Sequence, residues 1–133
     1  MGAVPEQNTA IFKYLFAIEN GLRELIISSL ATAAGPRWYR SRLPGDVLDK
    51  YRQGATIERS TSWTQLVPHH PMYYVDFADL RKILERDDNW RDSFEVIFKR
   101  RDLLASTLSE LEFIRNKIAH NRKATLQDLR IAR

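Results

Sequence analysis

Hydrophobic side chains recur along the chain at steps of three and four residues, which is the spacing of one face of an α-helix. A first run of this kind ends at Gly35 and Pro36, and its apolar positions are Ile11, Leu15, Ile18, Leu22, Leu25, Ile26 and Leu30. A second long run starts at Leu103 and continues through Leu104, Leu108, Leu111, Ile114 and Ile118. The pattern therefore predicts two long amphipathic helices, one near each end of the chain.

Between the two long helices, the sequence predicts shorter elements. Pro44 favours the start of a helix, and Gly54 would weaken the helix that follows. The stretch "TSWTQLVPHHPMYYV" at 61–75 contains two prolines and predicts an ordered, extended connection.

Asp76 has the character of an N-cap, and Asp79 three residues later supplies an aspartate version of the capping box. We therefore expect a helix over 77–86. A further helical pattern follows, with Trp90, Phe94, Ile97 and Phe98 at helical spacing.

No segment alternates between apolar and polar residues as a β-strand would, and no internal repeat is present. We therefore predict one all-α domain over 1–133, a bundle of four or five helices. Thr125 and Asp128 form a T-x-x-D pattern typical of a helix start, so we expect a further helix to begin there and the chain to be cut from a longer protein.

Composition narrows the range of chemistry. The chain has no cysteine, which excludes disulfides, thiolate nucleophiles and thiolate zinc sites, and its three histidines leave little for a metal site, so we expect no cofactor and no metal. A net charge of +4 permits a polyanionic partner without requiring one. The longest mostly apolar stretch, "LIISSLATAA" at 25–34, is too short to span a bilayer, so we expect a soluble, cytoplasmic protein without a membrane partner.

Candidate chemistry lies in "LSELEFIRNKIAHNRKATLQDL" at 108–129. On a helical wheel, Arg115 lies near the edge of the apolar seam, while Asn116 and His120 point nearly opposite to it. From spacing alone, the end of a helix is the simpler interpretation, because basic side chains favour the last turn and Asn121 would suit a left-handed cap. A functional site is the alternative interpretation.

The resemblance of this segment to a known family favours the functional site over a simple helix end. The string "LSELEFIRNKIAHNR" is similar to the signature helix of the HEPN superfamily (higher eukaryotes and prokaryotes nucleotide-binding), in which Arg, commonly followed by Asn, precedes His within four to six residues. The upstream "HHPMYYVDFADLRKILERDDNWRDSFEVIF" resembles the subfamily that includes the C-terminal domain of a fungal nuclear endonuclease for transcript surveillance. "FAIENGLRELI" resembles the Glu-x-x-x-Arg phrase of HEPN first helices. Together these segments cover about residues 11–126 in the expected order.

The resemblance implies a ribonuclease that cleaves RNA without metal, in a composite site between two signature helices of a homodimer. His120 would act as general acid or base at the ribose 2′-hydroxyl and the leaving 5′-oxygen. Arg115 would bind the scissile phosphate, and Asn116 would orient the imidazole or the ribose. The expected product carries a 2′,3′-cyclic phosphate.

Other polar residues each allow a structural and a functional interpretation. Glu19 and Arg23 form an i, i+4 pair whose simpler role is to stabilise the first helix, although in HEPN proteins the equivalent pair can orient the signature Arg or His. Lys117, Arg122 and Lys123 could hold an RNA backbone or simply form a solvated face.

A second stretch combines aromatic and basic residues. Trp38, Tyr39, Arg40 and Arg42 resemble a single-strand binding surface in composition, although Trp and Tyr after a helix break are more often packed under a loop.

Two functions follow from these features. The first is a dimeric HEPN endoribonuclease, the effector of a toxin or defence system, with RNA as substrate and an antitoxin or a regulatory domain as partner. The alternative is a non-catalytic HEPN adaptor of a larger protein, used for dimerisation or nucleic-acid binding. The intact set of Arg115, Asn116 and His120 favours the enzyme, because an adaptor has no need of all three.

Overall fold

The computed structural model describes residues 6–61, 63 and 69–131, and the side chains of 9–61, 63 and 69–120. In chain order, the elements are α1 (Glu6–Ala34), α2 (Trp38–Arg42), α3 (Gly45–Thr61), the 3-10 turn η2 (Pro71–Tyr74), α4 (Phe77–Glu85), α5 (Asp87–Asn89), the π-helical turn η3 (Trp90–Phe94), α6 (Glu95–Phe98) and α7 (Arg101–Ile131). These described ranges contain no β-strand, and the all-α prediction is confirmed.

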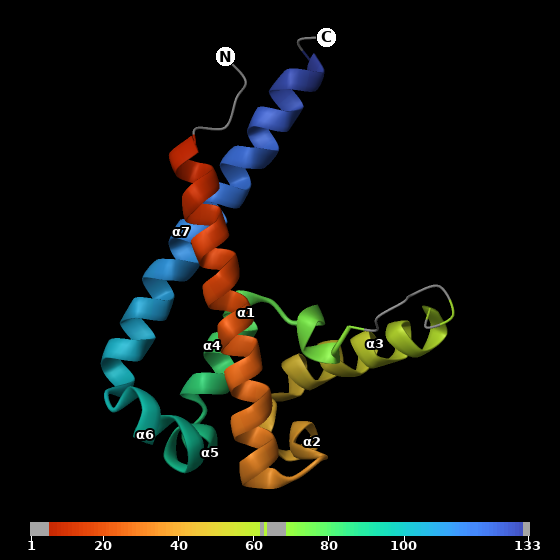
Figure 1. The fold of residues 1–133 in the computed structure, drawn as a ribbon, viewed down its shortest axis with the longest axis vertical. Helices are drawn as coiled ribbons and strands as arrows, with labels where there is room; N and C mark the ends of the chain where they lie inside the picture. Colours follow the sequence, from red (N-terminus) through yellow and green to blue (C-terminus); the bar gives the residue numbers. More distant parts are fainter. Residues whose placement is uncertain (1–5, 62, 64–68, 132–133) are drawn as a thin grey trace.

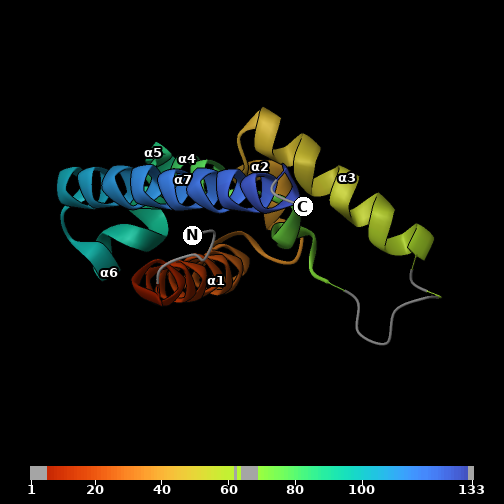
Figure 2. The ribbon, with the colours of Figure 1, turned by 90° about the horizontal axis from the view of Figure 1, so that it is seen from above.

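The two long helices, α1 and α7, organise the molecule. They cross and pack against each other, and α4 contacts both of them (Figure 1). Seen from above, α1 and α7 form adjacent layers, while α3 points away from both (Figure 2). The early turns of α1 and the later turns of α7 extend beyond the packed body (Figure 1). Each of these two helices therefore has one part that packs in the body of the domain and one part that projects from it.

The core lies where α1 meets α4 and the α5–α6 segment. α4 is the most completely covered helix, and its apolar face is fully buried through Phe77, Leu80, Ile83 and Leu84. The remaining fully buried apolar side chains are Ile26, Leu30, Val47, Met72 and Phe94. Burial of this apolar surface is the main stabilising contribution to the fold.

The predicted cap of α4 is confirmed. The Asp76 side chain accepts a hydrogen bond from the Asp79 backbone amide at 3.0 Å, and the Asp79 side chain accepts one from the Asp76 amide at 3.1 Å. Lys50 of α3 donates to Asp79 at 2.8 Å, so the capping box also joins α3 to α4.

The helix after Pro44 forms as predicted, and it is not interrupted at Gly54. α3 continues through Gly54. The glycine lets Tyr74 of η2 lie against the helix backbone, since a Cβ at position 54 would lie 2.5 Å from Cδ2 and 2.9 Å from Cβ of Tyr74. The glycine that weakens the helix locally thus allows η2 to dock on α3.

Gly54→Ala is expected to destabilise the fold by about 1–3 kcal/mol. The added methyl group would clash with Tyr74 atoms close to its backbone, so a change of side-chain rotamer alone cannot remove the clash. Urea unfolding followed by circular dichroism measures this. Gly21→Ala is the matched control, since nothing lies within 4 Å of its added Cβ, and it is expected to stabilise α1 by about 0.5–1 kcal/mol. Equal effects at both positions would contradict the packing argument.

Two local predictions need correction. Asn121 does not cap α7, and Thr125 does not begin a new helix, because α7 is continuous to Ile131. No glycine or proline occurs between Ala119 and Ile131, so nothing breaks the backbone hydrogen bonds there and the cap-like residues lie within one helix.

The predicted extended connection at 61–75 is only partly described, since residues 62 and 64–68 lie outside the described ranges. Its later part folds as η2, so it is not extended throughout. The helical pattern at 90–98 is confirmed, but with a π-helical turn at Trp90–Phe94. In the described part of the chain, no helix has the length and apolar character needed to cross a bilayer.

Candidate nucleic-acid processing site

Glu19 of α1 is a buried carboxylate shared by two arginines. It is 8% exposed, its Oε2 lies 2.9 Å from Nη1 of Arg23, and its Oε1 lies 3.2 Å from Nε of Arg115 on α7. Burial of a carboxylate is costly unless cationic or hydrogen-bonding partners replace the lost water. The ion pairs therefore join α1 to α7 at the arginine of the signature helix.

Arg23 is a structural anchor. It is 5% exposed, and its Nε and Nη2 donate to the backbone carbonyls of Met72 and Val75 at 3.1 and 2.7 Å. Its Nη1 donates to Asn20 as well as to Glu19, and the guanidinium lies over the ring of Tyr73 at 5.4 Å. These bonds occupy all three nitrogens, so Arg23 ties η2 and the start of the α4 cap to α1.

Arg115 differs from Arg23 because its ion pair uses only Nε. Among the described residues, no hydrogen bond or ion pair engages its two terminal nitrogens, and its side chain is 36% exposed. Two guanidinium groups against one carboxylate leave a net charge of +1 at this cluster. Arg115 can thus be held by Glu19 and still offer two donors to an anion.

Asn116 and His120 lie on another face of α7. Both are exposed, as the helical wheel predicts, and Phe113 and Lys117 share their outward face. Phe113 is 68% exposed, which is unusual for a phenylalanine in a single folded domain. Within one chain, the structure joins Glu19 to Arg115 and leaves His120 apart from that pair.

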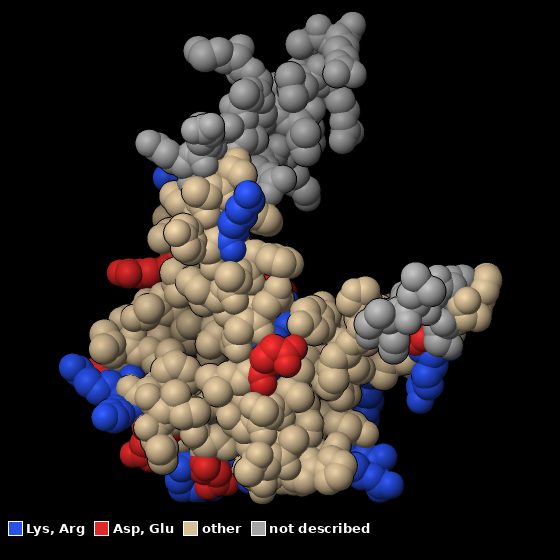
Figure 3. All heavy atoms as spheres, viewed as in Figure 1, with Lys and Arg blue, Asp and Glu red and all other residues tan. Residues whose placement is uncertain are grey.

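Apolar side chains near these residues are also exposed to solvent. A shallow hollow on α7 is lined by Ser106, Ser109, Glu110, Phe113 and Ile114. Figure 3 shows mostly uncharged side chains on the described parts of α1 and α7 above the body. The exposed apolar residues of the early part of α1 are Ile11, Tyr14, Phe16 and Ile18. Such grouped exposure marks an interaction surface.

Comparison with known proteins assigns the family. A family model described as Swt1-like HEPN matches residues 13–132. The chain belongs to the Swt1-like HEPN family. Neither curated proteins nor solved structures give a match. The predicted HEPN membership is confirmed, whereas the closer resemblance to the fungal nuclear endonuclease stays a prediction.

The matched range of this HEPN domain includes Glu19, Arg23, Arg115, Asn116 and His120. The contact between Glu19 and Arg115 corresponds to the second reading of the Glu-x-x-x-Arg phrase, in which the pair orients the signature arginine. The simpler reading also holds, because Glu19 and Arg23 do form the i, i+4 pair. Sequence reasoning missed the bonds from Arg23 to the carbonyls of Met72 and Val75, for which no sequence signal exists.

Of the remaining basic residues of the HEPN signature helix, only some have side chains within the described part of the chain. Lys117 is exposed, so it is available to a phosphate backbone. The side chains of Arg122 and Lys123 lie outside the described residues. Their predicted role in RNA binding stays a prediction.

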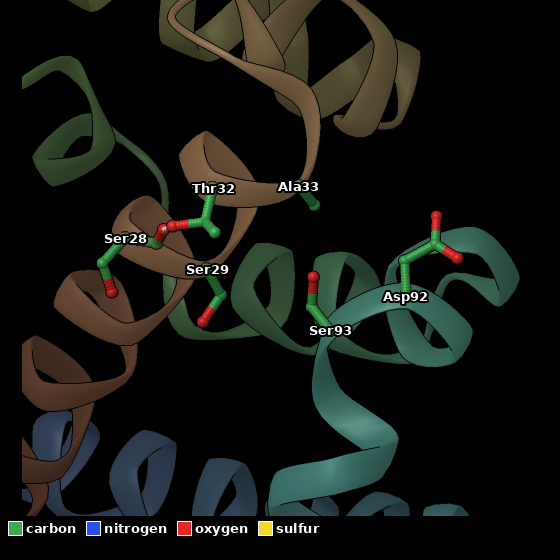
Figure 4. Close-up of a pocket in the computed structure, with 6 residues that line it drawn as sticks. All are labelled: Ser28, Ser29, Thr32, Ala33, Asp92 and Ser93. Atoms are coloured by element: carbon green, nitrogen blue, oxygen red, sulfur yellow. Dashed lines mark hydrogen bonds between the residues drawn. The ribbon is translucent and has the colours of Figure 1, made fainter.

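A second hollow of the HEPN domain lies between α1 and η3. Figure 4 shows its lining, which consists of Ser28, Ser29, Thr32, Ala33, Asp92 and Ser93. Ser28 and Thr32 donate to backbone carbonyls of their own helix, and the hydrogen bond from Arg42 keeps the pKa of Asp92 below its usual value. Asp92 is the ionisable group among the lining residues, and its lowered pKa makes it a weak base for activating these hydroxyls.

Adjacent histidines at 69 and 70 serve the fold of the HEPN domain. Nδ1 of His69 lies 3.4 Å from the buried Glu58, and Nδ1 of His70 accepts a hydrogen bond from the Met72 amide at 3.1 Å. Within the described ranges, no three His, Cys, Asp or Glu side chains gather as metal ligands would.

Proposed function

We propose that this HEPN domain is a metal-independent endoribonuclease that acts as a homodimer. The observation that carries the proposal is the arrangement on α7. Asn116 and His120 occupy an exposed face, and Arg115, on the side of the helix that meets Glu19, keeps two terminal nitrogens without a partner among the described residues. All three match the signature residues of the HEPN ribonucleases that the sequence resembles.

A second copy would complete the site. In a two-fold symmetric dimer, the same surface of both subunits meets itself, so two α7 helices facing each other bring two His120 and two Arg115 side chains together. The exposed Phe113 on the same face would be buried by such contact, and Tyr14 and Phe16 on α1 would extend the apolar surface.

Each side chain then has a chemical task. One His120 takes the proton of a ribose 2′-hydroxyl, whose oxygen attacks the adjacent phosphorus, and the other donates a proton to the leaving 5′-oxygen. Arg115 stabilises the charge that builds on the non-bridging oxygens, and Asn116 orients the imidazole or the ribose. The products are a 2′,3′-cyclic phosphate and a 5′-hydroxyl.

The biological role we propose is that of a toxin or defence effector restrained by an antitoxin or a regulatory domain. This role is supported by resemblance to HEPN ribonucleases.

A cleavage assay on mixed single-stranded and structured RNA in EDTA tests the proposal, together with a solution mass. We expect cleavage that survives chelation, fragments with cyclic phosphate ends, and a mass of twice the 15.6 kDa chain. A stable dimer that binds RNA without cutting it would contradict the enzyme and favour the adaptor.

Glu19→Gln is expected to lower kcat by about ten- to hundredfold, because Arg115 loses the charge that holds its Nε. RNA binding is expected to stay equal or to tighten, since a negative charge near the phosphate is removed. Steady-state kinetics separates kcat from KM, which a general loss of folded protein would not do.

Glu24→Gln is the matched control for this variant. Glu24 lies on α1 as well, is exposed, and accepts a hydrogen bond from the Tyr73 hydroxyl at 3.1 Å. We expect its kcat to match that of the wild type. An equal decrease in both variants would show that Glu19 does not position Arg115.

A further inference from the structure

A basic and aromatic hollow lies between α2, α3 and the start of η2. The helices α2 and α3 lie apart from the later turns of α7 (Figure 1). Its volume of about 420 Å³ is in the range of small-ligand sites. The lining residues are Tyr39, Arg40, Tyr51, Arg52, Ala55, Thr56, Arg59 and Pro71. Neither the ion-pair cluster at Glu19 nor the face of His120 contributes to it.

The charge of this α2–α3 hollow is positive. Three arginines line it, and no carboxylate is among the lining residues. Arg40 and Arg52 are exposed, and no ion pair joins either of them to a carboxylate in the described part of the chain. Arg59 donates to the Thr56 hydroxyl at 3.3 Å, which keeps its guanidinium at the rim. The guanidinium groups of Arg40 and Arg52, which have no carboxylate partner among the described residues, favour a phosphate-bearing ligand.

The wall of the hollow is aromatic and rigid. Tyr39 and Tyr51 stack with ring centroids 4.7 Å apart, and Tyr51 is packed edge-on against Trp38 and His70, each at 5.9 Å. Tyr51 is buried, whereas Tyr39 and Pro71 are half-buried and face the hollow. A flat, fixed ring beside cations is the arrangement on which single-stranded nucleic acids stack their bases.

The four aromatic and basic residues of the 38–42 segment thus have different roles. Trp38 packs in the core, and Arg42 pairs with Asp92 at 2.8 Å. Only Tyr39 and Arg40 line the hollow, and α3 supplies Arg52 and Arg59 at two-turn spacing on the same face. The site therefore combines residues that the sequence keeps apart.

We infer that the α2–α3 hollow is a second RNA-binding site, which takes a phosphate and its adjoining base from a single-stranded part of the RNA that the proposed ribonuclease cuts. The inference rests on the proposed function for the identity of the ligand.

RNA binding to the full chain tests the site directly. In a His120→Ala background, which prevents cleavage, fluorescence anisotropy would follow a labelled single-stranded RNA of about 20 nucleotides. For the double variant Arg40→Gln with Arg52→Gln, we expect about tenfold weaker binding. The slope of log K against log salt should fall by about 0.7 for the one lost phosphate contact. Unchanged affinity and slope would overturn the inference.

Arg91→Gln with Arg100→Gln is the matched control. It removes the same charge from two exposed arginines outside the hollow, and we expect less than about a twofold change in affinity. Equal losses in the two double variants would reduce the effect to net charge and overturn the site.

Tyr39→Leu tests the stacking surface. We expect weaker binding of single-stranded RNA and unchanged binding of inorganic polyphosphate, with the circular dichroism of the fold retained. An equal loss for both ligands would overturn the base-binding part.

The cleavage assay separates this inference from the proposed function. If the arginine variant loses RNA affinity while the wild type fails to cleave, the binding site stands and the ribonuclease does not. If the wild type cleaves and the variant binds RNA normally, the ribonuclease stands and the second site does not.

Discussion

Replacing His120 by Ala is expected to lower the rate of RNA cleavage by about 10²–10⁴-fold, which in most assays is loss of detectable activity. The imidazole is the group that would move protons at the 2′- and 5′-oxygens, and no other histidine lies on α7. The variant should fold normally, because His120 is exposed and alanine favours a helix. Single-turnover cleavage, with circular dichroism and a solution mass, measures these effects together.

His69→Ala is the control for loss of a histidine. This residue is exposed and lies before η2, where it pairs with Glu58, so cleavage should stay at the wild-type rate. Cleavage retained by His120→Ala would place the activity elsewhere. Cleavage lost together with the dimer would assign His120 to the interface and not to proton transfer.

Replacing Arg23 by Met is expected to destabilise the fold by about 3–5 kcal/mol. The substitution keeps much of the volume but leaves Glu19 with only one cationic partner, and the carbonyls of Met72 and Val75 lose their donors. Such a loss is a large part of the stability of a small domain. Urea unfolding at several concentrations of protein measures it and shows whether dimerisation compensates.

Two comparisons make the Arg23 result specific. Arg91→Met removes an exposed arginine and should change the free energy of unfolding by less than about 1 kcal/mol. Adding Glu19→Gln to Arg23→Met should recover part of the loss, because no buried charge is then left without its partner. A loss below about 1 kcal/mol in Arg23→Met would contradict its role as an anchor.

Local patterns in the sequence were sufficient to predict α1, α3, α4 and α7, but not α2 or the turn η2. The apolar spacing predicts α1 and α7, and Asp76 with Asp79 predicts the cap of α4, because these features depend on residues a few positions apart. Long-range contacts were not predictable in this way. Gly54 supports α3 through Tyr74, and the bonds of Arg23 span 49 and 52 residues, so neither has a signature within one segment.

In the candidate site too, local features were predictable from the sequence and long-range contacts were not. The helical wheel places Asn116 and His120 away from the core, as the structure has them. The link from Arg115 to Glu19 joins distant parts of the chain, and the resemblance to HEPN proteins gave it as one of two interpretations. Caps were over-predicted at Asn121 and Thr125, because residues that favour helix ends are tolerated within a helix that nothing interrupts.

The crossing of α1 and α7 at the Glu19–Arg115 pair gives the signature helix the mechanics of a lever. From Arg115, α7 extends about 24 Å to Ile131 but only about 7.5 Å to His120. Tilting α7 by about 10° at this pivot therefore shifts its far end by about 4 Å and His120 by about 1.3 Å, and a misplacement of about 1 Å is enough to cost a hundredfold in rate. In the proposed dimer, a ligand or domain that binds the last turns of α7 would therefore change the spacing of the two imidazoles without touching either of them.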